Sequence, residues 1–284
     1  YMKCGDFTML KCILLMLSEY YYDIVVDRLD EICDKVNEHQ VHVALKRMDQ
    51  YERNETLVIT DEPETAEALL KEGWYVVILY HEKNREKAFP AVRYGVEDLF
   101  LLEYRSFEEA FKRLAGLPWN ILETDRLKVR ESTVEDVDDF YRIYSEPSIT
   151  YYMENLYQKR EEEEAYMKAY IDQIYGFYGY GLWTVQLKDT GEVIGRAGLS
   201  VREGYDLPEL GFVIDAAHQN KGYAFEVCAA ILIYAKEELA FDKVQALVNE
   251  KNTASLGLLD RLGFEFQDNV IVSDGDYKLF TRNL

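Results

Sequence analysis

A glycine-containing loop with the sequence Gln219-Asn220-Lys221-Gly222-Tyr223-Ala224 is the segment whose residue types and spacing most directly suggest chemistry. It lies between an apolar run that we expect to be a strand and a segment that we expect to be a long helix. A helix N-terminus presents unpaired N–H groups and a partial positive charge, which suit a pyrophosphate. Gly222 would let a phosphate approach the backbone, and Ala224 would keep the first turn open. The loop predicts a phosphate-binding site, although a plain strand-to-helix connection can have the same composition.

Two further segments accompany this loop in a fixed order. Pro208–Asp215 (PELGFVID) comes before it, and Val248–Ser255 (VNEKNTAS) and Leu262–Glu265 (LGFE) follow it. Because of these three motifs, the segment from about residue 122 to residue 284 resembles the GNAT acetyltransferase superfamily. It is most similar to the RimJ/RimL-like branch, whose members acetylate protein N-terminal amines. The resemblance implies an N-acetyltransferase that transfers the acetyl group of acetyl-CoA to a primary amine of a protein N-terminus or a small molecule. It also implies that Gly211 marks a bulge in the strand that binds the pantetheine arm.

The resemblance assigns residues to the coenzyme site and to catalysis. In the family, the fourth strand, the loop after it and the start of the last helix bind acetyl-CoA. Here these positions are Phe212, Val213, Ile214, Gln219, Asn220, Lys221, Gly222, Tyr223, Ala224, Asn252 and Ser255. The strand carboxylate Glu209 is the candidate general base, directly or through water, and it could equally be a surface residue. Many members have a Tyr that protonates the thiolate, but the matching position here is Leu259. Ser255 is therefore the candidate proton donor, with helix capping as its alternative role.

Tyrosines are concentrated between residues 141 and 180, in the region that walls the acceptor cleft in this family. Tyrosines at helical spacing are more often packing residues than recognition residues. Tyr151, Tyr152 and Tyr157 fall in an expected loop, where an aromatic hydroxyl is more often functional. We therefore expect these three to contact the acceptor amine, whereas we interpret Glu226 as structural.

The hydrophobic pattern predicts an α/β protein with two domains, at residues 1–118 and 122–284, divided near the sequence LPWN. The second domain should have the mixed central sheet of the GNAT fold. The first should be a small helical and βαβ, Rossmann-like domain. It would begin with one or two helices over residues 8–50, followed by strands at 56–60, 74–80 and 98–102 with helices between them. Asp61 and Glu64 should form a capping pair.

This first domain faintly resembles the later half of a haloacid-dehalogenase (HAD)-like Rossmannoid. A DxDxT/V nucleophile motif is missing before Asp61, so we expect no phosphatase activity. A non-catalytic domain that binds a partner or ligand is the better interpretation.

The net charge and the cysteines of the chain favour some classes of partner and disfavour others. The net charge is −21 and both halves are acidic, which disfavours nucleic acid as a partner and favours a cationic acceptor. The four cysteines show no metal-ligand spacing and fit a reduced, cytoplasmic protein without a metal site. Residues 9–17 are too few to span a membrane. A homodimer is compatible with these features, and the alternative to an enzyme is a non-catalytic acyl-CoA-binding sensor.

Overall fold

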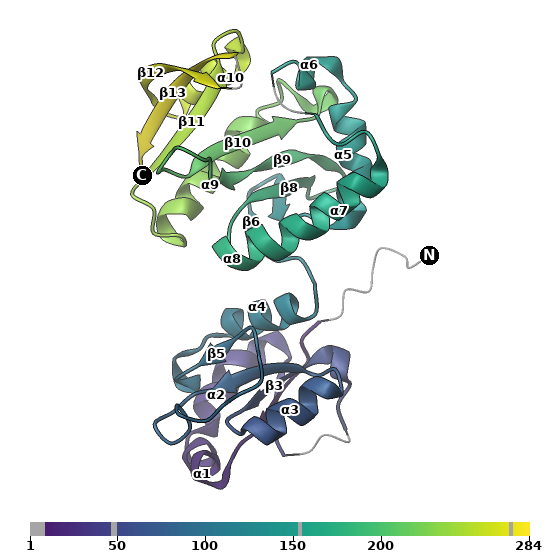
Figure 1. Ribbon diagram of the computed structural model, residues 1–284, viewed down its shortest axis with the longest axis vertical. Helices are drawn as coiled ribbons and strands as arrows, with labels where there is room; N and C mark the ends of the chain where they lie inside the picture. Colours follow the sequence, from purple (N-terminus) through teal and green to yellow (C-terminus); the bar gives the residue numbers. More distant parts are fainter. Residues whose placement is uncertain (1–8, 47–49, 153–154, 273–274) are drawn as a thin grey trace. The chain divides into compact units, whose positions relative to one another are not determined.

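The computed structural model describes residues 9–46, 50–152, 155–272 and 275–284, and it contains two compact units, Tyr1–Trp119 and Asn120–Leu284 (Figure 1). Within the described ranges, no helix combines the length and the apolar character that a transmembrane segment needs. The mixed α/β class expected from the sequence is confirmed.

The first unit contains a five-stranded parallel sheet in the order β2-β1-β3-β4-β5. Its strands are β1 (Cys12–Met16), β2 (His42–Leu45), β3 (Thr56–Thr60), β4 (Tyr75–Leu79) and β5 (Gly95–Val96). Its α-helices are α1 (Glu19–Asp27), α2 (Leu29–Val36), α3 (Pro63–Lys71) and α4 (Tyr104–Leu114). This strand order is that of a doubly wound fold, so the expected parallel sheet is confirmed.

Alternate residues of the central strands serve two separate cores, because successive side chains of a strand point to opposite faces. Ile13 and Leu15 of β1 pack with residues of α1, α2 and α4, whereas Cys12 and Leu14 pack with Ala66 and Leu69 of α3. Both faces of β1 are therefore buried, and its sequence CILLM is apolar without alternation.

Two elements expected for this unit are wrong. The segment expected to be helical over residues 8–50 contains the strands β1 and β2 as well as α1 and α2, so Cys12 lies on a strand and Cys33 on a helix. Cys4 lies outside the described residues. The segment expected to be a strand at 98–102 is a 3₁₀ turn (Leu99–Leu101) capped by Asp98, and the last strand is β5.

Asp61 does not form the expected capping pair with Glu64. Its carboxylate is buried at the carboxyl end of β3 and accepts hydrogen bonds from Ser18 N (2.7 Å) and Ser18 Oγ (2.5 Å). His81 Nε2 lies 3.0 Å from the same carboxylate. Asp61 thus connects the segments that follow β1, β3 and β4. These contacts leave it nearly inaccessible, at 1% exposure.

The second unit contains an eight-stranded mixed sheet in the order β12-β13-β11-β10-β9-β8-β7-β6. Its strands are β6 (Asn120–Glu123), β7 (Leu127–Arg130), β8 (Leu182–Leu187), β9 (Val193–Ser200), β10 (Glu209–Ile214), β11 (Lys243–Asn249), β12 (Glu265–Val272) and β13 (Gly275–Asn283). Its α-helices are α5 (Val137–Tyr144), α6 (Pro147–Thr150), α7 (Arg160–Tyr170), α8 (Gly176–Tyr178), α9 (Tyr223–Glu237) and α10 (Thr253–Arg261), and a π-helical turn (Ile171–Tyr175) joins α7 to α8. Neighbouring strands are antiparallel except β10 and β11, which are parallel.

Helices cover both faces of this sheet, as the adjacent residues Trp183 and Thr184 of β8 show. The Trp183 ring packs edge-on against Tyr234 of α9. The Thr184 hydroxyl donates to Asp136 at the start of α5 on the other face (3.0 Å). Val137 and Phe140 of α5 form a core with Val193 and Val213 on that second face. We call it the α5 face of the sheet below.

Candidate active site

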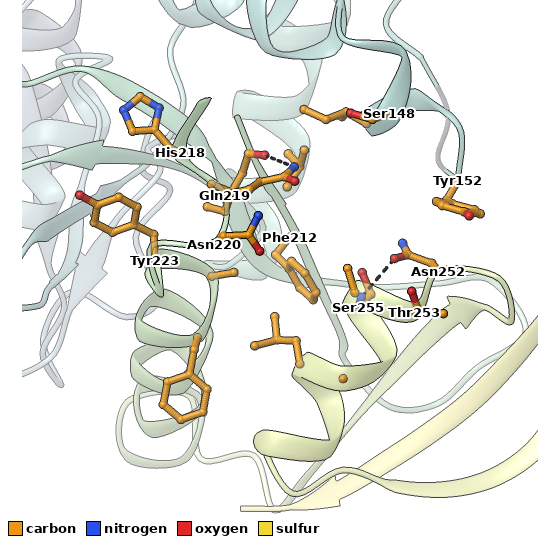
Figure 2. A pocket seen from close by; sticks show the side chains of 18 of the residues that line it. Ser148, Tyr152, Phe212, His218, Gln219, Asn220, Tyr223, Asn252, Thr253 and Ser255 are labelled. Carbon is orange, nitrogen blue, oxygen red and sulfur yellow. Dashed lines mark hydrogen bonds between the residues drawn. The ribbon is translucent and has the colours of Figure 1, made fainter. Parts of the chain in front are cut away.

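A cavity of about 590 Å³ lies at the end of β10, between the N-terminal ends of α9 and α10 (Figure 2). This is the size of pocket that holds a small molecule or cofactor. We call it the coenzyme pocket. Of the residues that the sequence assigned to acetyl-CoA, Phe212, Val213, Ile214, Gln219, Asn220, Gly222, Tyr223, Ala224, Asn252 and Ser255 line it. Lys221 is absent from the lining, and its carbonyl instead accepts a hydrogen bond from Arg126 Nη1 (3.1 Å).

The loop before α9 has the geometry of an anion site. Gly222 has φ of +85° and occupies the N-cap position, and among the described residues no side chain caps the first N–H groups of α9. Asn220 also has a positive φ, of 60°. Gln219 Nε2 donates to the carbonyl of Ile214 (3.0 Å), which ties the loop back to the end of β10 (Figure 2). The backbone donors at residues 222–225 therefore fit a pyrophosphate.

Arg126 supports this loop and was not anticipated from the sequence. Its guanidinium pairs with Glu226 on α9 (Nη2–Oε2 2.6 Å) and stacks over the Tyr223 ring at 4.3 Å. Burial alone would raise the pKa of Glu226, but hydrogen bonds from Thr124 and Arg126 outweigh burial and hold that pKa below its ordinary value. The predicted structural role of Glu226 agrees with these contacts. Because Arg126 is 95 residues before Lys221, sequence spacing gave no sign of the contact.

The strands β10 and β11 diverge beside the pocket. They pair only at Glu209 and Gln245, so the rest of β10 has one edge without a strand partner in the described ranges. The pairing of β10 with β9 continues through Gly211 and Gly198 without a register shift, so β10 has no bulge on the β9 side, whereas its pairing with β11 ends after Glu209. A Cβ at Gly211 would lie 3.2 Å from Leu182 Cδ2, so close packing explains this glycine. The free edge of β10 can hydrogen-bond an extended ligand arm.

Helix α10 borders the pocket with its capped N-terminus. The Asn252 Oδ1 accepts from Ser255 N (3.1 Å), so Asn252 caps α10 (Figure 2). Ser255 lines the pocket in the first turn, whereas Leu259 is fully buried and cannot replace a Tyr acid. Lys251 and Arg261, which sequence reasoning missed, add two cationic side chains to the pocket lining.

A second cavity, of about 720 Å³, lies over the other end of β9 and beside Glu209. We call it the tyrosine cavity. It is lined by Tyr166, Ala169, Tyr170, Gln173, Ile174, Tyr178, Tyr180, Leu182, Ser200, Val201, Arg202 and Glu203. Ser200 is directly opposite Glu209 in the sheet. Arg202 holds the Glu209 carboxylate through two hydrogen bonds, of which Nη2–Oε1 measures 2.9 Å.

Glu209 is thus placed at the meeting point of strand β10 and the tyrosine cavity, but it is not a free carboxylate. It is 6% exposed and pairs with Arg202, whose pKa is raised by the hydrogen bonds from its guanidinium to Glu209. The guanidinium competes with an incoming ammonium for the carboxylate. Three residues separate Glu209 from Phe212 of the coenzyme pocket, or about 10 Å along a strand.

None of the three tyrosines that sequence reasoning assigned to the acceptor lines the tyrosine cavity. Tyr152 lines the coenzyme pocket, and its hydroxyl donates to the carbonyl of Lys251 (3.1 Å). Tyr151 and Tyr157 are 73% and 51% exposed and line neither cavity. The tyrosine cavity is built from α7, the turn before β8 and the end of β9. The cluster FYGYG at residues 177–181 is the sequence signal that could have identified it.

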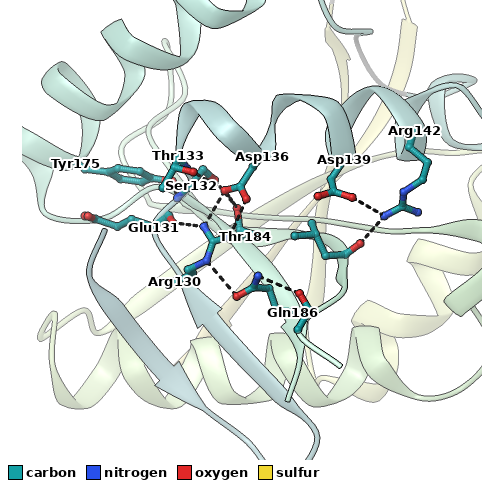
Figure 3. Close-up of polar contacts among 12 residues, drawn as sticks. Arg130, Glu131, Ser132, Thr133, Asp136, Asp139, Arg142, Tyr175, Thr184 and Gln186 are labelled. Atoms are coloured by element: carbon teal, nitrogen blue, oxygen red, sulfur yellow. Dashed lines mark hydrogen bonds and ion pairs between the residues drawn. The ribbon is translucent and has the colours of Figure 1, made fainter. Parts of the chain in front are cut away.

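One group of potential metal ligands occurs in the described part of the chain. Donor atoms of Glu192, Asp215 and His218 lie within 4.8 Å of one another. The Asp215 carboxylate is already paired with the Arg142 guanidinium, which opposes binding of a second cation there (Figure 3 shows the Arg142 side chain). These residues border the end of β10. The acetyl transfer proposed for this domain needs no metal ion.

Comparison with known proteins agrees with this geometry. Residues 126–265 match the family model described as an acetyltransferase (GNAT) domain. The second unit is a GNAT acetyltransferase domain. YkkB of Bacillus subtilis (strain 168) is 29% identical over 154 residues, covering 52% of this chain and 87% of the relative. YoaA of the same organism, described as an uncharacterized N-acetyltransferase, is 29% identical over 152 residues, covering 51% of this chain and 82% of the relative.

Solved structures show the same fold. A protein from Bordetella pertussis assigned to the GnaT family has a TM-score of 0.51 and 24% identity, covering 58% of this chain and 99% of that structure. RimL, a ribosomal alpha-N-protein acetyltransferase in complex with coenzyme A, has a TM-score of 0.50 and 13% identity, covering 58% and 98%. The GNAT domain is an enzyme domain that uses acetyl-CoA as acyl donor. The loop before α9, which lines the coenzyme pocket, has the geometry of an anion site.

Proposed function

We propose that this GNAT domain transfers the acetyl group to a primary amine that enters through the tyrosine cavity, and that Glu209 and Ser255 assist the transfer. The observation that carries this proposal is the position of β10. Its last residues line the coenzyme pocket, and Glu209 at its first residue contacts Arg202 of the tyrosine cavity. Two molecules bound in the two cavities would therefore meet along one strand.

Acetyl-CoA supplies a thioester carbonyl to which a neutral amine adds. The residues of this chain have three tasks: to hold the coenzyme, to accept the amine proton and to protonate the departing sulfur. The loop at 219–224 and the free edge of β10 would hold the coenzyme. Glu209 would receive the proton, directly or through a water molecule, once the acceptor disturbs its pairing with Arg202.

Ser255 is the candidate donor to the departing sulfur. Its backbone N–H is used by Asn252 in the helix cap, and its side chain lines the coenzyme pocket. A capping role alone would be fulfilled by the Asn252 side chain. The hydroxyl of Ser255 is therefore available for the reaction, which supports a role beyond capping.

We further propose a cytoplasmic location for the protein, because Cys12, Cys33 and Cys228 are free thiols in the structure. The first unit is proposed to be non-catalytic, since the Asp61 carboxylate is buried and fully used by Ser18 and His81.

The test of this function is release of coenzyme A thiol from acetyl-CoA in the presence of a panel of primary amines and peptide N-termini. We expect release above the background hydrolysis rate with at least one class of amine, and mass spectrometry should show an acetylated amine. Tight binding of acetyl-CoA without turnover of any amine would instead support the alternative of a non-catalytic sensor.

A further inference from the structure

Arg261, the last residue of α10, is an exposed cation that lines the coenzyme pocket. Its guanidinium stacks on the ring of Phe225, in the first turn of α9, at 4.6 Å from the ring centroid. Among the described residues, no carboxylate pairs with it within 4.0 Å. The chain has a net charge of −21, so an arginine that no acidic side chain neutralises is well suited to an anionic ligand.

One face of α10 borders the pocket along its whole length. The pocket-lining residues Ala254, Gly257, Leu258 and Arg261 follow the spacing i, i+3, i+4, i+7, which places them on the same side of the helix. A Cβ at Gly257 would contact nothing within 4 Å, so the space over this face is open. Arg261 is six residues beyond Ser255, or about 9 Å along the helix axis. The pocket therefore extends from the capped N-terminus of α10 to Arg261 at the far end of the helix.

The loop before α9 divides a bound coenzyme into two arms. A pyrophosphate on the N–H groups of residues 222–225 has the pantetheine arm on one side and the adenosine on the other. Because the free edge of β10 suits the pantetheine arm, the adenosine has the part of the pocket between α9 and α10 (Figure 2). Phe225, Leu258 and Arg261 line that part. Coenzyme A carries a third phosphate on the 3′-hydroxyl of this adenosine, so an anionic group of the ligand would lie beside Arg261.

Two other cationic side chains near the pocket are less suited to this phosphate. The Arg126 guanidinium is already paired with the Glu226 carboxylate (Nη2–Oε2 2.6 Å). Lys251 precedes α10, where the Tyr152 hydroxyl donates to its carbonyl (3.1 Å). Helix α10 has nine residues, or about 14 Å, so Lys251 and Arg261 border opposite ends of the pocket. Arg261 is the cation on the side of the adenosine.

We propose that Arg261 binds the 3′-phosphate of the coenzyme and makes the domain select coenzyme A over its 3′-dephospho form. The fork of N–H donors on a guanidinium matches phosphate oxygens, and two parallel hydrogen bonds can form. The Phe225 ring supports one face of the guanidinium and leaves its N–H edge available. This inference concerns binding of the acyl donor. It does not depend on which amine accepts the acetyl group or on the roles of Glu209 and Ser255.

The test compares the Kd of coenzyme A with that of 3′-dephospho-coenzyme A by isothermal titration calorimetry. The two ligands differ only in the 3′-phosphate, so the ratio of their Kd values isolates the contacts of that group and needs no turnover. For the wild type we expect the dephospho form to bind about 10-fold more weakly, the size of one charge-assisted hydrogen-bond contribution. Added salt should reduce this ratio, because Arg261 is exposed and its charge is screened.

Three variants separate this contact from a general effect of charge. Arg261→Met should reduce the ratio to near 1 by weakening only the binding of coenzyme A. Arg261→Lys keeps the charge but loses the fork of donors, so it should retain part of the ratio. Lys236→Met removes a cation in the last turn of α9, outside the pocket lining, and should leave the ratio at the wild-type value. Melting curves report folding, and if Arg261→Met does not fold, the wild-type ratio and Arg261→Lys decide.

Equal Kd values for the two forms in the wild type would overturn this inference and leave the coenzyme pocket intact. So would a ratio that persists in Arg261→Met, or one that is lost in Lys251→Met instead. Equal weakening of both forms in Arg261→Met would place Arg261 on the pyrophosphate and also contradict it. If neither form binds, the assignment of the coenzyme pocket is wrong as well. The expected ratio in a protein that acetylates no amine would support this inference and contradict the proposed function alone.

Discussion

Substitution of Gly222 should separate coenzyme binding from folding. Gly222 has φ of +85° at the N-cap of α9, and a Cβ there would lie 3.4 Å from Arg126 Nη2, the end of a flexible side chain. Gly222→Ala should therefore fold, at a cost of about 1–2 kcal/mol for a non-glycine residue in the left-handed region. For a domain the size of Asn120–Leu284, this corresponds to a fall in Tm of about 2–8 °C.

The effect of Gly222→Glu on affinity should be much larger than its effect on stability. The added carboxylate would repel the pyrophosphate and block the backbone donors of the first turn of α9. Loss of two charge-assisted hydrogen bonds, at about 1.5–3 kcal/mol each, would raise the Kd for acetyl-CoA by about 10²- to 10⁴-fold. Isothermal titration calorimetry measures this Kd, and thermal denaturation measures stability in parallel.

Gly191 provides the matched control. It has φ of +73° in the turn between β8 and β9, and a Cβ there would contact nothing within 4 Å. Gly191→Ala should lower Tm by about the same amount as Gly222→Ala, because both place alanine in the left-handed region, but the Kd should stay at the wild-type value. A folded Gly222→Glu variant that binds acetyl-CoA with wild-type affinity would refute the assignment of the 219–224 loop.

Three further predictions concern single residues. Glu209→Gln keeps the side-chain shape but removes a base, so kcat with an accepted amine should fall by on the order of 10²-fold or more near neutral pH. Part of this loss should be recovered at higher pH, where more of the amine is neutral. A wild-type rate at neutral pH would exclude Glu209 as the base. Ser255→Ala should lower kcat while the Kd for acetyl-CoA stays nearly unchanged, because the Asn252 cap remains, and an unchanged kcat would remove Ser255 from the mechanism. Asp61 should support no magnesium-dependent hydrolysis of p-nitrophenyl phosphate, since its carboxylate is buried and bound by Ser18 and His81, and hydrolysis that Asp61→Asn abolishes would contradict this prediction.

The sequence predicted the second unit better than the first, for a physical reason. In the second unit, turns and helix caps such as Gly222 and Asn252 mark where elements begin, and the apolar run expected to be a strand before the 219–224 loop is β10. In the first unit, Cys12–Met16 is apolar on both faces, and a short run of this kind has no periodicity that separates a buried strand from a helix.

The coenzyme pocket was predictable and the tyrosine cavity was not. Most residues that line the coenzyme pocket come from two short segments, so a local motif could identify them. The tyrosine cavity combines α7, the turn before β8 and the end of β9, and only the fold brings Tyr166, Tyr180 and Arg202 together. Sequence reasoning selected Tyr151 and Tyr157 because they fall in a loop. Neither lines a cavity, although their rings contact Tyr152 and Tyr166, which do.

The central claim is that acetyl-CoA bound at the 219–224 loop donates its acetyl group to an amine. The most direct measurement is amine-dependent release of coenzyme A thiol, made side by side for the wild type, Gly222→Glu and Gly191→Ala. The account predicts release and an acetylated product with the wild type and Gly191→Ala, and only background release with Gly222→Glu. Wild-type release by a folded Gly222→Glu variant, or no amine-dependent release by the wild type with any amine, would contradict it.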